Sequence, residues 1–180
     1  MKILNSKFKI QKMKFLLSSF CLLFLVSCYT FVNNNLDARV KTVQIKTFPN
    51  NAALVNATLS QDFTTLLQNR FLKTNLKGAI ENPDLLIEGE ITDYSITPTA
   101  ISNPITTDGV SVQAAQNKLA ITVKVHYENK IQPEKNFDRT YTDEATFSSD
   151  LDINQIETSQ VKIVNDRIIN KIFNDIVADW

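Results

Sequence analysis

The sequence predicts an α+β fold, a two-layer sandwich in which two helices pack on one face of a four-stranded, mostly antiparallel sheet. Apolar residues recur with the helical period over residues 59–71 and again from about residue 152 to the C-terminus. Between these stretches, apolar and polar residues alternate strictly over residues 119–127, as in a half-buried strand. Two weaker extended patterns and an early strand complete the predicted order of strand, helix, three strands, helix. Apolar helix faces covering one side of a sheet form this kind of sandwich.

The first strand and the first helix are predicted from alternation and a capping signal. Apolar residues interleave with polar residues over 39–48. Thr58 and Gln61 have the spacing of a capping box, so a helix is expected to begin at Thr58. The pair Lys77-Gly78 is expected to end this helix, because glycine readily adopts the backbone conformation that follows a helix.

Three further strands are predicted at residues 85–97, 119–127 and 137–147. Gly89 falls on the apolar side of the first of them, which predicts either the close approach of a helix or a bulge there. Residues 97–112, which include the turn signal Asp108-Gly109, are predicted as a loop. The final helix carries a long apolar stripe that must be buried against the sheet or a partner.

The first 27 residues have the features of a bacterial lipoprotein signal peptide. Five lysines and no acidic residue precede an apolar run from Phe15 to Val26, which is too short to span a bilayer as a helix. Leu25-Val26-Ser27-Cys28 then resembles a lipobox, in which the cysteine thiol is alkylated by a diacylglycerol. We therefore predict removal of residues 1–27, lipidation of Cys28 as a membrane anchor, a tether over 28–37 and a single domain over 38–180.

Composition excludes several classes of function. Five of the 19 basic residues lie in the signal, which leaves 14 against 19 acidic residues, so no basic footprint for nucleic acid is present. Cys21 leaves with the signal and Cys28 carries the lipid, so disulfides and thiolate metal sites are excluded. The sequence has no glycine-rich phosphate-binding motif and no nucleophile-elbow motif. We predict no cofactor, no metal and no enzymatic activity.

Two segments of the chain resemble the LptE family of lipopolysaccharide-assembly lipoproteins, in its Bacteroidetes-type branch. They are residues 86–94, with the sequence LIEGEITDY, and residues 114–125, with the sequence AAQNKLAITVKV. Residues 48–56 and 59–61 are similar to that branch as well. The resemblance covers nearly all of the mature chain. Its motifs are structural, so Cys28 is the one functional residue that it assigns by position.

The resemblance implies a lipoprotein anchored on the periplasmic side of the outer membrane. Members of this family sit as a plug inside the large β-barrel LptD, assist its assembly and bind lipopolysaccharide on its way to the surface. Tyr29 and the lack of an acidic run after Cys28 favour the same location. The competing prediction is a pilot or binding lipoprotein that docks another envelope complex, such as a secretin. A lipid-anchored hydrolase is poorly supported, because a single histidine leaves few nucleophile–base pairs.

Four cations are the predicted ligand-binding residues. Lys118, Lys124 and Lys130 share the parity of the polar side of strand 119–127, and Arg139 lies on the following strand. Cations of this kind suit phosphate groups such as those of lipid A, as point charges or as forks. The alternative is an ordinary solvated sheet face, because Glu128 interrupts the row.

Three other titratable residues share such a polar face. His126 would need a nucleophile within reach and a water-excluding pocket to act as a catalytic base, and the sequence shows neither. Glu88 and Glu90 lie two residues apart on one strand, a spacing that defines no acid–base geometry. We interpret all three as solvated residues. The predicted loop over 97–112 could enter a barrel lumen or form a hairpin tip.

Overall fold

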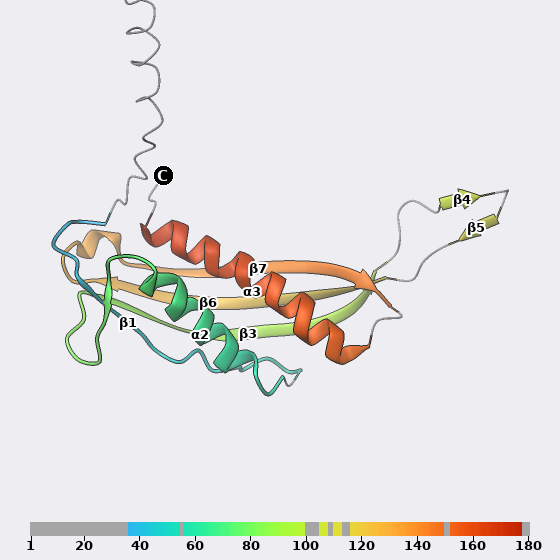
Figure 1. Ribbon diagram of the computed structural model, residues 1–180, viewed down its shortest axis with the longest axis horizontal. Helices are drawn as coiled ribbons and strands as arrows, with labels where there is room; N and C mark the ends of the chain where they lie inside the picture. Colours follow the sequence, from blue (N-terminus) through green and yellow to red (C-terminus); the bar gives the residue numbers. More distant parts are fainter. Residues whose placement is uncertain are drawn as a thin grey trace, which may run out of the picture. The chain divides into compact units, whose positions relative to one another are not determined.

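The computed structural model describes residues 36–54, 56–99, 105–107, 110–112, 116–149 and 152–177. Two helices, α2 (Leu59–Leu72) and α3 (Ile153–Val177), pack on a sheet of five strands (Figure 1). The predicted α+β class and the two helices are confirmed. None of the described helices combines the length and the apolar character needed to cross a bilayer. The signal peptide, Cys28 and residues 28–35 of the expected tether lie outside the described residues.

The sheet has the strand order β2-β1-β3-β6-β7. Its strands are β1 (Thr42–Ile45), β2 (Lys77–Gly78), β3 (Leu85–Thr99), β6 (Gln116–Asn129) and β7 (Phe137–Ser148). The three long strands β3, β6 and β7 pair antiparallel, whereas β1 runs parallel to both β2 and β3. A short 3₁₀ helix, η2 (Pro133–Lys135), lies in the connection from β6 to β7. The sheet is therefore mixed, and the prediction of a mostly antiparallel sheet holds only for its three long strands.

The prediction of four strands was wrong, because a fifth strand follows the first helix. Helix α2 ends at Leu72, and the Lys77-Gly78 pair that was expected to end it forms β2 instead. The Lys77 amide donates to the Lys41 carbonyl at 2.9 Å, and the Ala79 amide donates to the Val43 carbonyl at 2.9 Å. A strand of two residues has no periodicity of its own, so only these bonds to a distant segment define it.

The predicted loop over 97–112 contains strand structure. Strand β3 continues to Thr99, and β4 (Ile105–Thr107) pairs antiparallel with β5 (Val110–Val112) as a separate two-stranded sheet. The turn signal Asp108-Gly109 lies between these two strands and outside the described residues. The paired strands agree with the hairpin alternative, while entry into a barrel lumen stays a prediction.

Helix α2 begins where the sequence predicts, but a different residue caps it. Thr58 occupies the N-cap position and makes no side-chain capping bond. The buried Asn56 instead accepts hydrogen bonds from the amides of Thr58 at 3.1 Å and Leu59 at 3.0 Å. Asparagine is a good acceptor for these otherwise unpaired amides.

The core lies between the sheet and the two helices. The predicted stripe of α2 is buried at Leu59, Phe63, Leu67 and Phe71. The stripe of α3 is buried at Val161, Val164, Ile168, Ile172 and Ile176, and α3 packs on β6, whose buried side carries Leu119, Ile121, Val123, Val125 and Tyr127. Among the residues that the structure describes, none forms such a layer on the other side of β6. Alternation along the strand therefore separates a covered side from an open side of the sheet.

Gly89 permits a close approach, but the groups that approach it are the backbone of β6 and the ring of Phe48 rather than a helix. A Cβ atom at this position would lie 2.1 Å from the Lys124 carbonyl oxygen and 2.6 Å from the Phe48 ring. Phe48 belongs to the segment between β1 and α2, and its ring packs on Phe63 of α2 at 5.3 Å between centroids. The bulge lies further along β3, between Ile91 and Asp93. Glycine is required because any side chain would occupy the place of backbone and ring.

Candidate functional site

The open side of the sheet carries most of the polar residues singled out from the sequence. In the strand register, His126 of β6 stands between Glu88 of β3 and Asp138 of β7. One step along the same side of the sheet, Lys124 stands opposite Glu90 of β3. The antiparallel pairing of three long strands thus brings side chains from distant segments into one layer.

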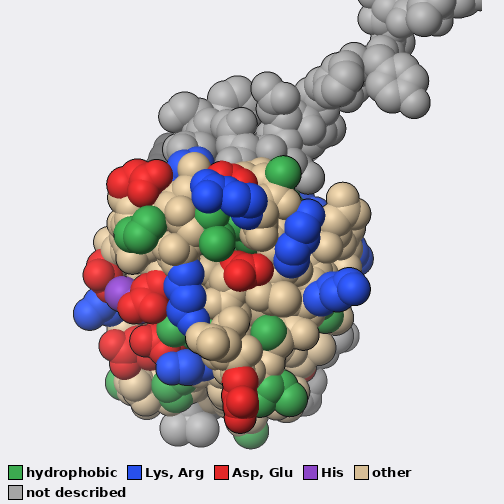
Figure 2. Space-filling model, turned by 90° about the vertical axis from the view of Figure 1, so that its left-hand side faces the viewer, with side chains coloured by type: hydrophobic (Ala, Val, Ile, Leu, Met, Phe, Trp, Pro, Cys, Tyr) green, Lys and Arg blue, Asp and Glu red, His purple; other side chains and the backbone are tan. Residues whose placement is uncertain are grey.

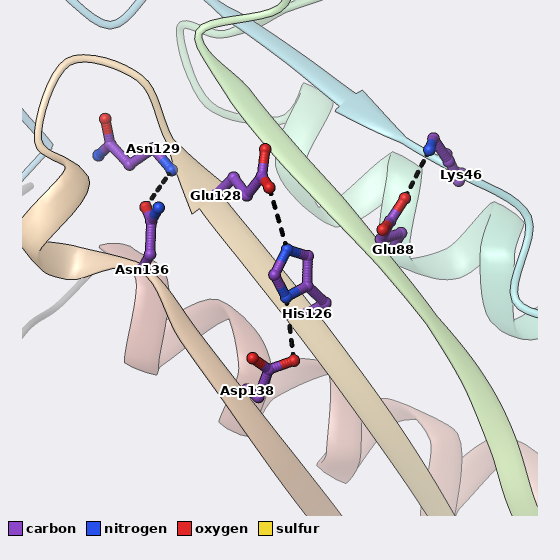
Figure 3. A network of polar contacts seen from close by, with 7 residues as sticks. All are labelled: Lys46, Glu88, His126, Glu128, Asn129, Asn136 and Asp138. Carbon is purple, nitrogen blue, oxygen red and sulfur yellow. Dashed lines mark hydrogen bonds and ion pairs between the residues drawn. The ribbon is translucent and has the colours of Figure 1, made fainter.

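His126 is held between two carboxylates (Figure 3). Its Nδ1 atom lies 2.9 Å from Asp138 Oδ1, and its Nε2 atom lies 3.2 Å from Glu128 Oε1. Hydrogen bonding to Asp138, followed by hydrogen bonding to Glu128, raises the pKa of His126 above its ordinary value of 6.5. Both ring nitrogens are hydrogen-bonded while the side chain keeps 35% of its surface exposed, so the interpretation of His126 as a residue of the solvated face stays a prediction. Neither of these partners is a nucleophile that it could activate.

Beside this cluster, the two glutamates of β3 have separate partners. The Lys46 ammonium group forms an ion pair with Glu88 at 2.5 Å, as Figure 3 shows, and the Asn51 side-chain amide donates to Glu90 at 2.7 Å. The two carboxylates therefore do not act as a pair. Among the described histidine, cysteine, aspartate and glutamate residues, no group could hold a metal ion.

A hollow of about 390 Å³ lies over this part of the open side. The charged residues that line it are Lys46, Glu88, Glu90, Lys124, His126 and Asp138. Three carboxylates thus face two lysines and one histidine, so opposite charges largely cancel. Figure 2 shows the same mixture, with acidic side chains gathered beside the purple histidine. A multiply charged anion gains little from such a balanced surface.

The four predicted ligand-binding cations do not converge. Lys118 pairs with Glu144 at 2.9 Å, and Lys130 donates from its ammonium group to Asn82 Oδ1 at 3.1 Å. The Lys124 ammonium group has no hydrogen-bond or ion-pair partner in the part of the chain that the structure describes. Lys124 is six positions along β6 from Lys118, which is about 20 Å in an extended strand. These lysines cannot all contact one phosphate group.

Arg139 lies on the covered side of the sheet. It stands opposite Val125, a core residue, and its guanidinium group donates to Asp175 of α3 at 2.7 Å. The same group lies 4.6 Å from the centroid of the Phe137 ring. Arg139 shares its parity with Phe137 and Tyr141, so the sequence pattern contained the signal that places it apart from the lysines.

Sequence reasoning also missed Arg70, which lies in the last turn of α2. Its guanidinium carbon lies 3.9 Å from the centroid of the Phe173 ring of α3. The two helices meet here, because the rings of Phe71 and Phe173 are 5.2 Å apart in an edge-on arrangement. No signal in the sequence marks Arg70, since its setting depends on a residue of the other helix.

The described residues thus form an α+β domain with two helices on one side of a mixed sheet and a polar surface of largely balanced charge on the other side. Residues 40–180, which include every described strand and helix, match the model of the family described as "LptE: Lipopolysaccharide-assembly". The chain belongs to this LptE family, which is non-enzymatic. The family resemblance of the sequence is confirmed at this level, while the Bacteroidetes-type branch stays a prediction.

Several solved structures are similar to this chain at low sequence identity. A minor lipoprotein from Acinetobacter baumannii shares 17% identity over 76% of this chain and 90% of its own, with a TM-score of 0.49. The PelC dodecamer from Paraburkholderia phytofirmans shares 12% sequence identity over 78% of this chain and 92% of its own chain, with a TM-score of 0.47. The rare lipoprotein B from Shewanella oneidensis shares 9% sequence identity over 75% of this chain and 90% of its own chain, with a TM-score of 0.42. No curated protein sequence matches the chain.

Proposed function

We propose that this protein is an outer-membrane lipoprotein that plugs an LptD-type β-barrel, assists the assembly of that barrel and binds lipopolysaccharide during its insertion into the outer leaflet. The observation that carries the proposal is the LptE family match over residues 40–180. The lipobox at Cys28 supports a lipid anchor on the periplasmic side of the outer membrane, with residues 1–27 removed, 28–37 as tether and 38–180 as the domain.

The open side of the sheet suits the interior of such a barrel. The lumen of a large outer-membrane barrel is polar and hydrated, whereas its apolar band faces lipid. The open side presents ion pairs, such as Lys46–Glu88 and Lys118–Glu144, that favour contact with a hydrated wall. The stretch from 97 to 112, with the ribbon of β4 and β5, is a second candidate for contact with the barrel.

Lys118, Lys124 and Lys130 are proposed as separate contacts to phosphates of lipopolysaccharide, because their spacing excludes one shared phosphate. Arg139 would contact the ligand apart from them, on the other side of the sheet. Charge reversal of Lys118 and Lys124 is expected to weaken binding of lipopolysaccharide. Unchanged binding would remove these lysines from the proposal.

The partner is tested by a gentle detergent pull-down of the lipidated protein from its own membranes. We expect a stoichiometric LptD-type barrel in the bound fraction. Recovery of the lipoprotein alone would contradict the plug role. Recovery with a ring-forming channel would favour the alternative, a pilot lipoprotein that docks a secretin or a similar envelope complex.

A further inference from the structure

Arg70 has free hydrogen-bond donors at a point where α2 and α3 meet. Its guanidinium group stacks on the Phe173 ring at 3.9 Å, and its Nε atom is shut off from solvent with no acceptor. None of the described carboxylates forms an ion pair with it. Stacking fixes the plane of a guanidinium group and leaves its outer N–H groups able to bind an anion in a fork.

A hollow of about 400 Å³ opens beside Arg70, between the two helices. Its polar lining comes from Asn69, Lys73, Asp166 and Asn170, and its apolar lining from Leu66, Leu72 and Ile169. Asp166 is already paired with Lys162 at 2.7 Å, so its charge is compensated. Arg70 and Lys73 therefore make the hollow net positive, unlike the balanced hollow over the open side of the sheet.

An apolar strip continues from this hollow toward the β2 edge of the sheet. Leu72 lines the hollow and also a second one, of about 240 Å³, together with Ile45, Ala79 and Ile80. Leu72 is 50% exposed and Ile80 is 88% exposed, the two most exposed large apolar side chains among the described residues. Cations beside such a strip match a ligand that has both an anionic group and hydrocarbon.

We propose that Arg70, Lys73 and the Leu72–Ile80 strip bind a phosphorylated, acylated lipid. The phosphate lies against Arg70 and Lys73, and an acyl chain runs along Leu72 toward Ile80. This inference rests on the proposed function, because lipopolysaccharide is a lipid of this class, and it adds a lipid contact on the helix side of the sheet. The guanidinium fork matches the oxygens of phosphate, and burial of an acyl chain removes Leu72 and Ile80 from water.

A purely structural role for these cations gives a different expectation. Positive side chains near the C-terminus of a helix compensate the partial negative charge of its last carbonyl groups. In that case, removal of Arg70 or Lys73 would lower the thermal stability of the protein and leave lipid contacts unchanged. The experiment therefore measures both quantities.

The full-length protein, solubilised in a non-ionic detergent, carries a photo-crosslinking amino acid at position 72 and is irradiated with purified lipopolysaccharide. We expect a lipid adduct at position 72 and none at position 54, because Leu54 is a similarly exposed leucine, at 44%, that lines neither hollow. Arg70→Gln is expected to lower the adduct yield about 10-fold and Lys73→Gln less. Lys41→Gln removes the same charge from an exposed residue outside both hollows and serves as the matched control.

Short-chain competitors separate the two parts of the ligand. Dioctanoyl phosphatidic acid is expected to suppress the adduct at position 72, whereas dioctanoylglycerol and inorganic phosphate each lack one part and should compete poorly. An adduct yield that Arg70→Gln leaves unchanged would overturn the inference. A yield that falls only because Arg70→Gln unfolds part of the protein, as its melting temperature would show, would overturn it as well. Neither result would affect the proposal of a barrel partner. If no adduct forms at position 72 while the wild-type protein binds lipopolysaccharide, the lipid binds elsewhere and the proposed site at Arg70, Lys73 and the Leu72–Ile80 strip is wrong. If the protein binds no lipopolysaccharide, the lipid-binding part of the proposed function fails with it.

Discussion

The covered and the open sides of the sheet are built from the same strands with side chains of opposite character. Along β6, Ile121, Val123 and Val125 on the covered side are fully buried, whereas Lys118 and His126 on the open side keep 35% of their side chains exposed. Burial of apolar area stabilises the fold by roughly 25 cal/mol per Å². Exposed ion pairs contribute at most about 1 kcal/mol each. The covered side should therefore determine stability, which leaves the open side available for contacts with a partner.

Both sides carry paired cations and one cation without a described partner, but the surroundings of those unpaired cations differ. On the open side most cations have an anionic neighbour, as in Lys46–Glu88 and Lys118–Glu144. On the helix side Arg139 is likewise paired, with Asp175, whereas Arg70 stacks on an aromatic ring and has no described carboxylate as partner. A paired charge must give up its partner before it can bind a ligand, and an unpaired one need not. The unpaired Lys124 lines a hollow of balanced charge, whereas Arg70 lines a net positive one, and this difference is why the lipid site is proposed beside α2 and α3.

The largest expected effect tests whether the covered side dominates stability. Phe63 is fully buried, and its ring lies 5.3 Å from that of Phe48. We expect Phe63→Ala to lower the free energy of unfolding by about 3–5 kcal/mol, because it removes a large buried ring and leaves a cavity. Thr140→Ala, an exposed residue of the open side, should change it by less than about 0.5 kcal/mol. Urea unfolding measures both, and similar losses would contradict the comparison.

Gly89 tests how tightly the covered side is packed. Gly89→Ala would place a Cβ atom 2.1 Å from the Lys124 carbonyl oxygen, which the β3–β6 pairing holds in place. We expect a loss of about 2–3 kcal/mol in urea unfolding, since backbone and the Phe48 ring must both shift. The neighbouring Glu90→Ala, on the open side, should cost under about 1 kcal/mol. A tolerated alanine at position 89 would show that the strands have room to move.

Asp84 tests the connection of β1 to the start of β3. Its Oδ2 atom accepts from the Lys41 amide at 2.8 Å and from the amide and the hydroxyl of Thr42, each at 2.9 Å. Asp84→Ala should lower stability by about 2 kcal/mol at neutral pH, because these donors lose a charged acceptor. Asp93→Ala, exposed on β3, is the control and should cost less than about 0.5 kcal/mol.

The contribution of Asp84 should depend on pH. The hydrogen bond from the Lys41 amide is the main reason that the pKa of Asp84 is below its ordinary value of 3.8. A lowered pKa in the folded state means that the stabilisation is present above 3.8 and is lost as the pH falls through the folded value. Acid titration of the wild type and Asp84→Ala should therefore show converging stabilities. A constant difference across this range would contradict the assignment.

The smallest expected effect concerns His126 on the open side. Asp138 of β7 and Glu128 of β6 raise its pKa, while Glu88 of β3, which also faces it, is paired with Lys46. A raised pKa means that the added stability is fully present below 6.5 and is lost as the pH rises through the folded value. Relative to His126→Gln the gain should stay below about 1 kcal/mol, because solvent screens the cluster.

An NMR titration of the imidazole of His126 provides the direct check. We expect a midpoint above 6.5, with Asp138→Asn lowering it more than Glu128→Gln because Asp138 is the stronger partner. A wild-type midpoint at or below 6.5 would mean that the two carboxylates do not hold the ring as the structure describes.

The sequence predicted the helices and strands in which the spacing of apolar residues shows which side is buried. The strand expected at 119–127 is the centre of β6, and the buried stripes of α2 and α3 are those read from the helical period. The fifth strand was missed because β2 is two residues long and is defined by its bonds to β1. The side of the sheet on which Arg139 lies could have been read from its parity with Phe137 and Tyr141.

The sequence alone determined the α+β class and the resemblance to the LptE family, and it predicted a lipobox that ends at Cys28, because periodicity and motifs are properties of contiguous residues. Only the tertiary structure decided that the sheet is mixed, that His126 stands between two carboxylates and that Arg70 stacks on Phe173. Each of these depends on which distant segments become neighbours. The local sequence pattern indicates which residues are buried, but it does not indicate which residues of other segments cover them.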